Sequence, residues 1–291
     1  MLQEYIQIFL DGYSGYWSYL STEILYPSWR NYFWWLLGIS LVVWGLEIAF
    51  PWRKNQAAIR VDFWLDGFYM FFNFFIFSLI GYNAVSNVAA EAFTDVLAGF
   101  GIENLVAIQV ASWPVWAQFA LMFVLADFMQ WNIHRLLHYS PWLWEFHKVH
   151  HSVEQLGFAA CLRFHWMETV IYKSLQYIPL AMIGFGLDDF FILHIVTIVL
   201  GHINHANVKI TYGPLKYLIN NPVMHLWHHA KELPAGNSKG VNYGISLSLW
   251  DYLFGTAYIP NENEYVPLGF EQSEEFPKTF LQQLTHPWKK K

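Results

Sequence analysis

The stretch "HKVHHSVE", residues 147–154, places three histidines within five positions: His147, His150 and His151. The same spacing returns in "HLWHH", as His225, His228 and His229. The chain has 13 histidines in 291 residues, so two such triplets are a poor match to chance. Residues i, i+3 and i+4 share one face of a helix. Each triplet therefore predicts a helix that presents three imidazoles together.

Both triplets follow a helix-start signature. Ser140 and Pro141 precede the first triplet, and Asn221 and Pro222 precede the second. Serine or asparagine is favoured as an N-cap residue, and proline is favoured at the first helical position. The sequence thus predicts two short helices that begin at these prolines.

The composition indicates a membrane protein rather than an ordinary soluble domain. Hydrophobic residues make up 55% of the chain and charged residues only 13%, against about 25% charged residues in average proteins. We expect a single membrane-embedded domain over residues 1–291. The net charge of −6 is spread along the chain, which gives no sign of a nucleic-acid partner. Cys161 is the single cysteine, so an intrachain disulfide is excluded.

Apolar segments of the length that a bilayer requires predict about five transmembrane helices. They cover about 31–50, 63–84, 113–138, 166–184 and 187–204. The short link "GFGLDD" makes the last two a hairpin. The first 20 residues fit a helix at the membrane interface and a plain packing helix equally well. Residues 85–112 form a more polar stretch between the second and third spans.

The basic residues orient these spans. Fourteen of the 16 Lys and Arg residues fall in segments 51–62, 134–165 and 205–291. Five alternating spans place all three segments on one side, which the positive-inside rule makes cytoplasmic. The sequence therefore predicts a cytoplasmic helical cap, residues 134–165 and 205–260, that carries both triplets.

Further histidines join the triplets. His134 and His138 are four residues apart on one helix face, and His202 and His205 end the fifth span. The triplets, the first of these pairs and His205 give nine imidazoles, more than one metal ion uses. Neutral imidazole binds iron, zinc, copper and nickel. The count predicts a dinuclear metal site without naming the metal. The H-E-x-x-H pattern of zinc proteases is absent.

Several other residues have two interpretations each. Asp127 either orients a ligand imidazole or pairs with Arg135. His165 and His202 are either close to the metals or structural. We interpret His194 and His286 as hydrogen-bonded core residues, and Cys161 as a small buried residue.

The motifs resemble those of a known family. "HRLLH", "HKVHHS" and "HLWHH" are similar to the three histidine boxes of the fatty acid hydroxylase and sterol desaturase superfamily. "LRFHWMET", "HANV" and the closing "VNYGISLSLWDYLFGT" at 241–256 resemble further segments of that family, in the same order. The likeness covers about 127–256.

The resemblance implies an all-α integral membrane protein with a cytoplasmic dinuclear site. It implies two iron ions, which zinc can replace in purified protein. The implied ligands are His134, His138, His147, His150, His151, His202, His205, His225, His228 and His229, with His202 as an open tenth position. Residues implied beside the ligands are Asp127, His165, Glu168, Asn242 and Asp251.

The resemblance also implies a function. The expected enzyme is an oxidoreductase that hydroxylates an unactivated C–H bond of a lipid with dioxygen. The sequence lacks a flavin or nicotinamide fingerprint, so we expect a separate reductase or small redox carrier to supply electrons. Lipid or sterol desaturation and ether-lipid or carotenoid oxidation are alternatives on the same site. A non-enzymatic metal-binding protein or transporter is less favoured, because a transporter is expected to place ionisable residues in the middle of its spans.

Overall fold

The computed structural model describes residues 2–102, 110–260 and 266–288. These residues form helices and loops, with isolated β-bridges in place of strands, which confirms the all-α prediction. The α-helices are α1 Leu2–Leu25, α2 Tyr32–Ala49, α3 Phe63–Phe71, α4 Asn83–Gly99, α5 Val115–Tyr139, α6 Pro141–His151, α7 Trp166–Tyr172, α8 Ile178–Ile183, α9 Leu187–His205, α10 Pro222–His228, α11 Leu249–Leu253 and α12 Phe280–Thr285.

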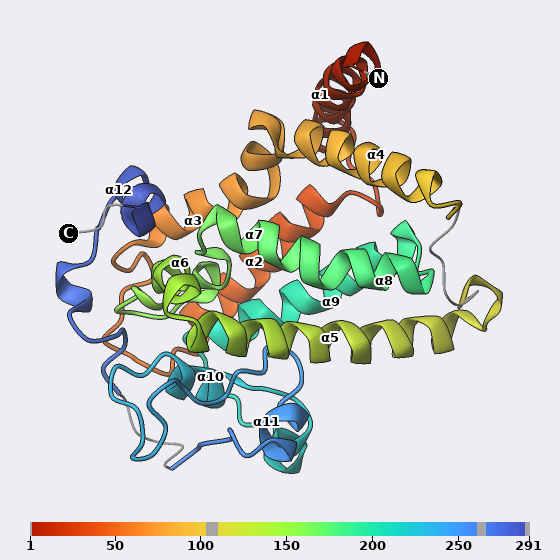
Figure 1. The fold of residues 1–291 in the computed structure, drawn as a ribbon. Helices are drawn as coiled ribbons and strands as arrows, with labels where there is room; N and C mark the ends of the chain where they lie inside the picture. The colour runs from red at the N-terminus through yellow and green to blue at the C-terminus, as the bar shows by residue number, and fades with distance from the viewer. Residues whose placement is uncertain (1, 103–109, 261–265, 289–291) are drawn as a thin grey trace.

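The long helices lie side by side, and the histidine-bearing helices gather at one end of them. Helix α9 packs between α2 and α5, and the α7–α8 segment packs along α5 (Figure 1). Helices α6 and α10 contact the ends of α5 and α9 where residues 139 and 205 lie. Helices α1 and α4 pack against each other on one side of this bundle. The bundle thus brings the ends of four helices together.

Four of the five predicted spans correspond closely to helices. Residues 31–50, 113–138 and 187–204 become α2, α5 and α9, and 166–184 become α7, a π-helical turn Lys173–Tyr177 and α8. The second span differs. It runs from α3 through two π-helical turns, Phe72–Ile76 and Ser78–Tyr82, departs from helical geometry at Gly81, and continues as α4 to Gly99. Contact with α1 holds this extension, because the Asn83 side chain donates to the carbonyl of Gly12 at 3.1 Å.

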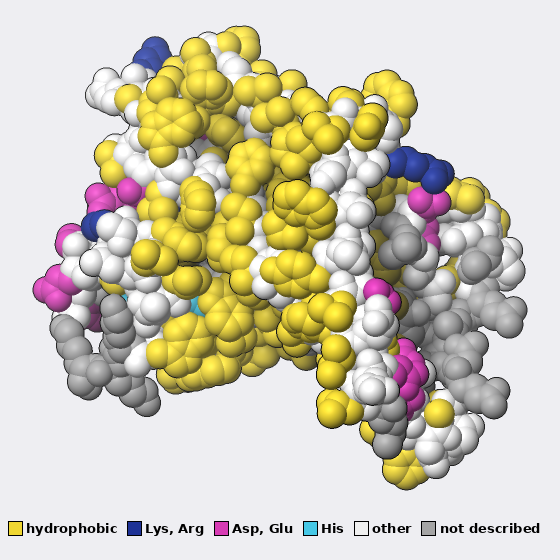
Figure 2. Space-filling model, turned by 90° about the horizontal axis from the view of Figure 1, so that it is seen from above, with side chains coloured by type: hydrophobic (Ala, Val, Ile, Leu, Met, Phe, Trp, Pro, Cys, Tyr) yellow, Lys and Arg dark blue, Asp and Glu magenta, His cyan; other side chains and the backbone are white. Residues whose placement is uncertain are grey.

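Two of the described helices are long and apolar enough to cross a membrane. They are Tyr32–Ala49 and the broken helix Phe63–Gly99. Large apolar side chains such as Leu41, Val42 and Trp64 are exposed on them, and Figure 2 shows a broad hydrophobic surface with charged side chains toward its margins. Such a surface fits lipid contact. These features indicate a membrane protein, and the number of five spans stays a prediction.

The two predicted helix starts are confirmed. The Ser140 hydroxyl accepts a hydrogen bond from the backbone N–H of Leu143 at 3.4 Å, with Pro141 opening α6. The Asn221 side chain accepts from the N–H groups of Val223 and Met224 at 3.0 and 3.1 Å. These caps satisfy N–H groups that have no partner within the helix. They fix the register in which each triplet faces inward.

Candidate metal centre

Nine buried histidines form two groups. Within each group, one ring nitrogen of every histidine lies within 4.8 Å of the others. Group one takes residues from α5, α6 and α10: His134, His138, His147, His151 and His228. Group two takes residues from α6, α9 and α10: His150, His205, His225 and His229. The structure therefore brings together the nine histidines that the sequence singled out as ligands.

Each triplet contributes to both groups. On α6, His147 and His151 belong to group one and His150 to group two; on α10 the division is reversed, with His225 and His229 in group two. Helix geometry explains the division. Around a helix, residue i+4 lies about 40° from residue i in one direction, and residue i+3 lies about 60° from it in the other direction. The i and i+4 histidines of a triplet therefore face one metal group, and the i+3 histidine faces the other. The rings of His151 and His229 stack with centroids 4.4 Å apart, so the two groups are neighbours.

One loop, residues 239–243, orients three imidazoles of group one. The carbonyls of Lys239, Val241 and Tyr243 accept hydrogen bonds from Nδ1 of His138, His228 and His134 at 3.0, 2.8 and 2.7 Å. The intervening residues Gly240 and Asn242 have positive φ values of 131° and 53°, so the carbonyls are presented by a loop rather than by a strand. Each donated Nδ1–H leaves Nε2 of that ring free to bind a metal.

Three further imidazoles are oriented from other elements. Glu168 on α7 lies 2.9 Å from Nδ1 of His147. The carbonyl of Arg163 accepts from His150 at 3.1 Å, and the carbonyl of Gly201 accepts from His205 at 2.8 Å. These contacts fix the same tautomer, with Nε2 as the free nitrogen.

The free nitrogens converge. Nε2 of His138, His151 and His228 is buried without a hydrogen-bond partner. In group two, the Nε2 atoms of His205 and His225 lie 2.8 Å apart. Nδ1 of His205 donates to the carbonyl of Gly201, so Nε2 of that ring carries a lone pair, and buried polar atoms without partners are costly. A metal ion bound by these nitrogens satisfies them, so the residues present fit a metal in each group.

The electrostatics favour neutral imidazoles. Burial lowers the pKa of His150, His151, His228 and His229 well below the usual histidine value, and the neighbouring imidazoles add to the effect. Neutral rings are the form that binds metal ions. The protein thus holds these side chains ready for metal binding at neutral pH.

Apart from Glu168, the carboxylates and Asn242 contact backbone groups and other side chains rather than imidazoles. Buried Asp251 accepts from the N–H groups of Tyr243 and Gly244 at 2.9 and 2.8 Å. Asn242 donates to the carbonyls of Met224 and Tyr258 at 2.9 and 2.7 Å. Both sequence-based interpretations of Asp127, as a partner of a ligand imidazole or of Arg135, were wrong. Its carboxylate instead accepts from the indole of Trp250 at 2.8 Å and the N–H of Leu247 at 3.3 Å, because α5 presents it toward the closing segment.

His202 and His165, the two histidines with two interpretations each, lie apart from the groups. Nε2 of His202 faces the hydroxyl of Ser40 at 3.1 Å, and His202 is in neither group. His165 caps α7, accepting from the N–H of Met167 at 3.1 Å, and its Nε2 donates to the carbonyl of Leu284 at 2.9 Å. These contacts give both side chains structural roles in the described residues.

The remaining histidines and Cys161 lie outside the groups. His194 contacts the hydroxyl of Tyr177 and the carbonyl of Phe190, as expected of a hydrogen-bonded core residue. His286 is half-buried and lies 3.3 Å from Glu145, so its interpretation as a core residue was wrong, because the C-terminal segment leaves it at the surface. Cys161 is a free, partly buried thiol.

Arg163, within the "LRFHWMET" motif, is a structural residue that the spacing of the histidines did not predict. Its guanidinium is fully buried and forms ion pairs with Asp62 at 2.9 Å and Asp66 at 3.1 Å, and it donates to the hydroxyl of Ser152 at 2.9 Å. This network fixes the backbone carbonyl that orients His150. An arginine in a chain with few charged residues was the signal available in the sequence, whereas backbone carbonyls such as those of 239–243 give none.

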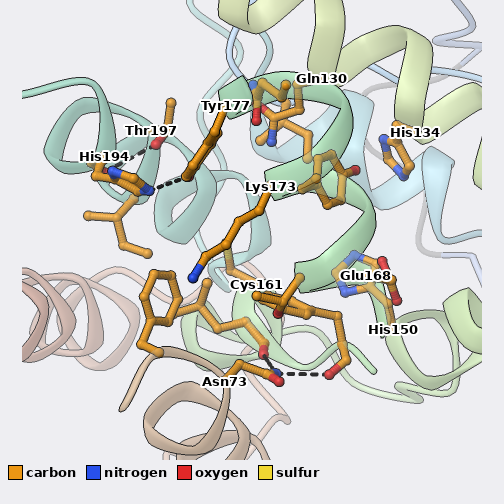
Figure 3. Close-up of a pocket in the computed structure, with 18 of the residues that line it drawn as sticks. Asn73, Gln130, His134, His150, Cys161, Glu168, Lys173, Tyr177, His194 and Thr197 are labelled. Carbon is orange, nitrogen blue, oxygen red and sulfur yellow. Dashed lines mark hydrogen bonds between the residues drawn. The ribbon is translucent and has the colours of Figure 1, made fainter. Parts of the chain in front are cut away.

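An apolar cavity of about 190 Å³ reaches the metal centre from within the helix bundle. His134, His147 and His150 line it at one end, and Tyr177 and His194 line the other. Figure 3 shows His134 and His150 on one side of the cavity and His194 on the opposite side. A long apolar ligand in this space would therefore extend up to both histidine groups.

The chain matches known proteins in this region. The fatty acid hydroxylase family matches residues 119–256. The chain is 37% identical to an ornithine lipid hydroxylase of Rhizobium tropici over 179 residues, 62% of this chain and 53% of the relative. It is 32% identical to the alkylglycerol monooxygenase of Homo sapiens over 149 residues, 50% of this chain and 32% of the relative.

A more distant relative is a very-long-chain aldehyde decarbonylase of Oryza sativa subsp. japonica, 27% identical over 144 residues, 48% of this chain and 46% of the relative. The matched region spans about half or less of the length of these relatives. No solved structure shows a significant match. The matched region contains all nine grouped histidines, in the order that the resemblance required. These comparisons confirm the resemblance to the fatty acid hydroxylase superfamily for residues 119–256.

Proposed function

We propose that this chain is a membrane-bound di-iron oxygenase that hydroxylates an unactivated C–H bond of a lipid. The observation that carries the proposal is the convergence of nine imidazole nitrogens, in two adjacent groups, at the end of an apolar cavity. Group one and group two would each hold one iron ion. Zinc would fit the same imidazoles in purified protein.

Each part of the site has a task in this reaction. Bound iron would supply the reductive activation of dioxygen and the removal of hydrogen from an unactivated C–H bond. Cavity residues such as Phe74 and Leu162 would align the lipid chain and exclude water. The carbonyls of Lys239, Val241 and Tyr243 keep the imidazole rings in place. Fixed imidazole rings would hold the metal ions in place, and the cavity would hold the lipid, so that the reacting carbon stays beside the metals.

Electrons would come from a separate reductase or small redox carrier. A second hollow, of about 360 Å³, reaches His138, His151 and His228 beside the partly buried Trp144. It approaches group one from residues of the cap, whereas the lipid cavity opens among the membrane helices. The two hollows allow a lipid substrate and a redox partner to approach the centre from different sides.

The same site supports other oxidations of lipids. The relatives are named for ornithine lipid hydroxylation, alkylglycerol oxidation and aldehyde decarbonylation, so oxidation of an ether lipid is the second candidate. Desaturation of a lipid is a further candidate, because it begins with the same removal of hydrogen from a C–H bond.

We also propose the topology: five spans, a cytoplasmic cap at 134–165 and 205–260, and one catalytic domain over 1–291. A reporter fused after Lys291 is expected to read cytoplasmic. A reading on the opposite side of the membrane would reject the orientation.

Oxygen uptake tests the proposed function. The iron-supplemented, full-length chain with a reductant and a redox carrier is expected to consume dioxygen when a suitable member of a lipid panel is added, with oxygenated product detected by mass spectrometry. His228→Ala should abolish uptake, while His286→Ala, a histidine outside both groups, should retain it. Lipid-independent uptake alone, or a fully active His228→Ala variant, would reject the proposal.

A further inference from the structure

A lysine lines the lipid cavity. Lys173 opens the π-helical turn between α7 and α8 and is the one Lys or Arg among the described residues of the cavity wall. The one carboxylate of that wall, Glu168, contacts His147. In Figure 3 the Lys173 side chain extends away from His134 and His150, toward the side where His194 lies. The cavity therefore has an imidazole end and a cationic end.

Lys173 has no carboxylate partner in the part of the chain that the structure describes. Its nitrogen lies 4.6 Å from the centroid of the Tyr82 ring. A cation–π contact offsets only part of the cost of removing an ammonium group from water. Charged side chains within membrane segments are rare and mark sites that bind ligands. Among the described residues no anion meets this ammonium group, so an anionic group of a bound ligand would complete the site.

Other polar groups of the cavity wall also lack partners. The hydroxyls of Tyr32 and Thr169 and the side-chain oxygen of Asn73 are buried without a hydrogen bond. The two hydroxyls can donate to an oxyanion, and the Asn73 amide nitrogen already donates to the carbonyl of Phe164 at 2.8 Å. A cavity with an unpaired cation and free donors suits an amphiphile better than a plain hydrocarbon.

We propose that Lys173 binds the acidic group, a carboxylate or a phosphate, of the lipid that the metal centre oxidises. This inference rests on the proposed function and names a residue that determines specificity. Five residues, or about 7.5 Å of helix, separate Lys173 from Glu168 beside His147. An acid held at Lys173 would fix how far along the lipid chain the carbon at the histidines lies. Lys173 thus selects both the class of lipid and the position that reacts.

Competition binding tests the proposal without turnover. The metal-loaded, full-length protein in neutral detergent is incubated with radiolabelled palmitate and competing lipids. Palmitate is compared with methyl palmitate, and dipalmitoyl phosphatidate with dipalmitoylglycerol, so the two pairs distinguish a fatty acid from a phospholipid source. At least one acid is expected to bind about tenfold or more tightly than its neutral counterpart, as a charge-assisted contact would give.

Variants connect this preference to one side chain. Lys173→Met, which keeps most of the apolar stem, should bind acid and neutral lipid about equally, and Lys173→Arg should restore the preference. Lys54→Met, at an exposed lysine outside this cavity, should keep it. Metal content and gel-filtration profile check that each variant is folded, and Lys173→Gln replaces the methionine variant if that one is not.

Equal binding of acid and neutral lipid by the wild-type protein would overturn the proposal, as would a folded Lys173→Met variant that keeps the preference. The binding assay and the oxidation assay test the two proposals separately. A protein that prefers acids but oxidises no lipid rejects the proposed function alone. A protein that oxidises lipids but shows no acid preference rejects only the role of Lys173.

Discussion

Asp251 and His134 are connected through the backbone of a single residue. The Asp251 carboxylate accepts the N–H of Tyr243 at 2.9 Å, and the carbonyl of Tyr243 accepts Nδ1–H of His134 at 2.7 Å. Asp251 also accepts from the indole of Trp131 at 3.0 Å and the hydroxyl of Thr256 at 2.6 Å. A carboxylate far from any imidazole in sequence therefore positions a candidate metal ligand.

Asp251→Asn should weaken group one. One amide oxygen cannot accept the hydrogen bonds that two carboxylate oxygens accept, so about 1–3 kcal/mol of stability is expected to be lost. The segment that carries the orienting carbonyls then loosens, and metal affinity falls. Thermal unfolding and metal analysis measure both effects. Asp188→Asn, at an exposed surface pair with Arg30, should change stability by no more than about 0.5 kcal/mol.

Removing one histidine from each group should give different metal contents. The wild-type chain is expected to hold about two transition-metal ions. His150→Ala leaves three imidazoles in group two, so about one ion should be lost; His228→Ala leaves four in group one, as many as group two has natively, so metal is retained more fully. Both variants should lose oxidation activity. Equal, full metal content in both variants would contradict the two-group site.

Glu168 should act by orienting His147. Glu168→Gln keeps an oxygen that can accept Nδ1–H, whereas Glu168→Leu removes it. The leucine variant is expected to lose about 10–100-fold in metal affinity or activity, and the glutamine variant markedly less. Metal titration and oxygen uptake of the two variants are the measurements. Similar behaviour of Gln and Leu variants would show that the contact is not an orienting one.

Metal removal should destabilise the protein. The converging buried nitrogens of both groups lose their partner when the metal leaves, and a ligand at 1,000 times its Kd stabilises the folded state by about 4.1 kcal/mol. A chelator should therefore lower the thermal unfolding temperature, and added iron or zinc should restore it. If the unfolding temperature stays unchanged although metal analysis shows that the metal has been removed, the bound metal does not stabilise the folded protein.

The sequence by itself determined the parts of the protein that depend on local spacing. The triplets, the caps at Ser140 and Asn221 and the apolar lengths predicted helices with their histidine faces, because hydrogen bonds at a helix start and the 3.6-residue period act over a few residues. The count of nine imidazoles predicted two metals, and the motifs predicted the superfamily that residues 119–256 confirm.

Only the tertiary structure decided which partner each side chain meets. It divided the triplets between two groups, gave Asp127 to Trp250 instead of an imidazole, and extended the second span into α4 against α1. It also brought the carbonyls of 239–243 onto three imidazoles that lie 109, 101 and 13 residues away in the sequence. Backbone carbonyls are chemically the same at every residue, so contacts made by them are invisible until long-range packing has fixed which segments are neighbours.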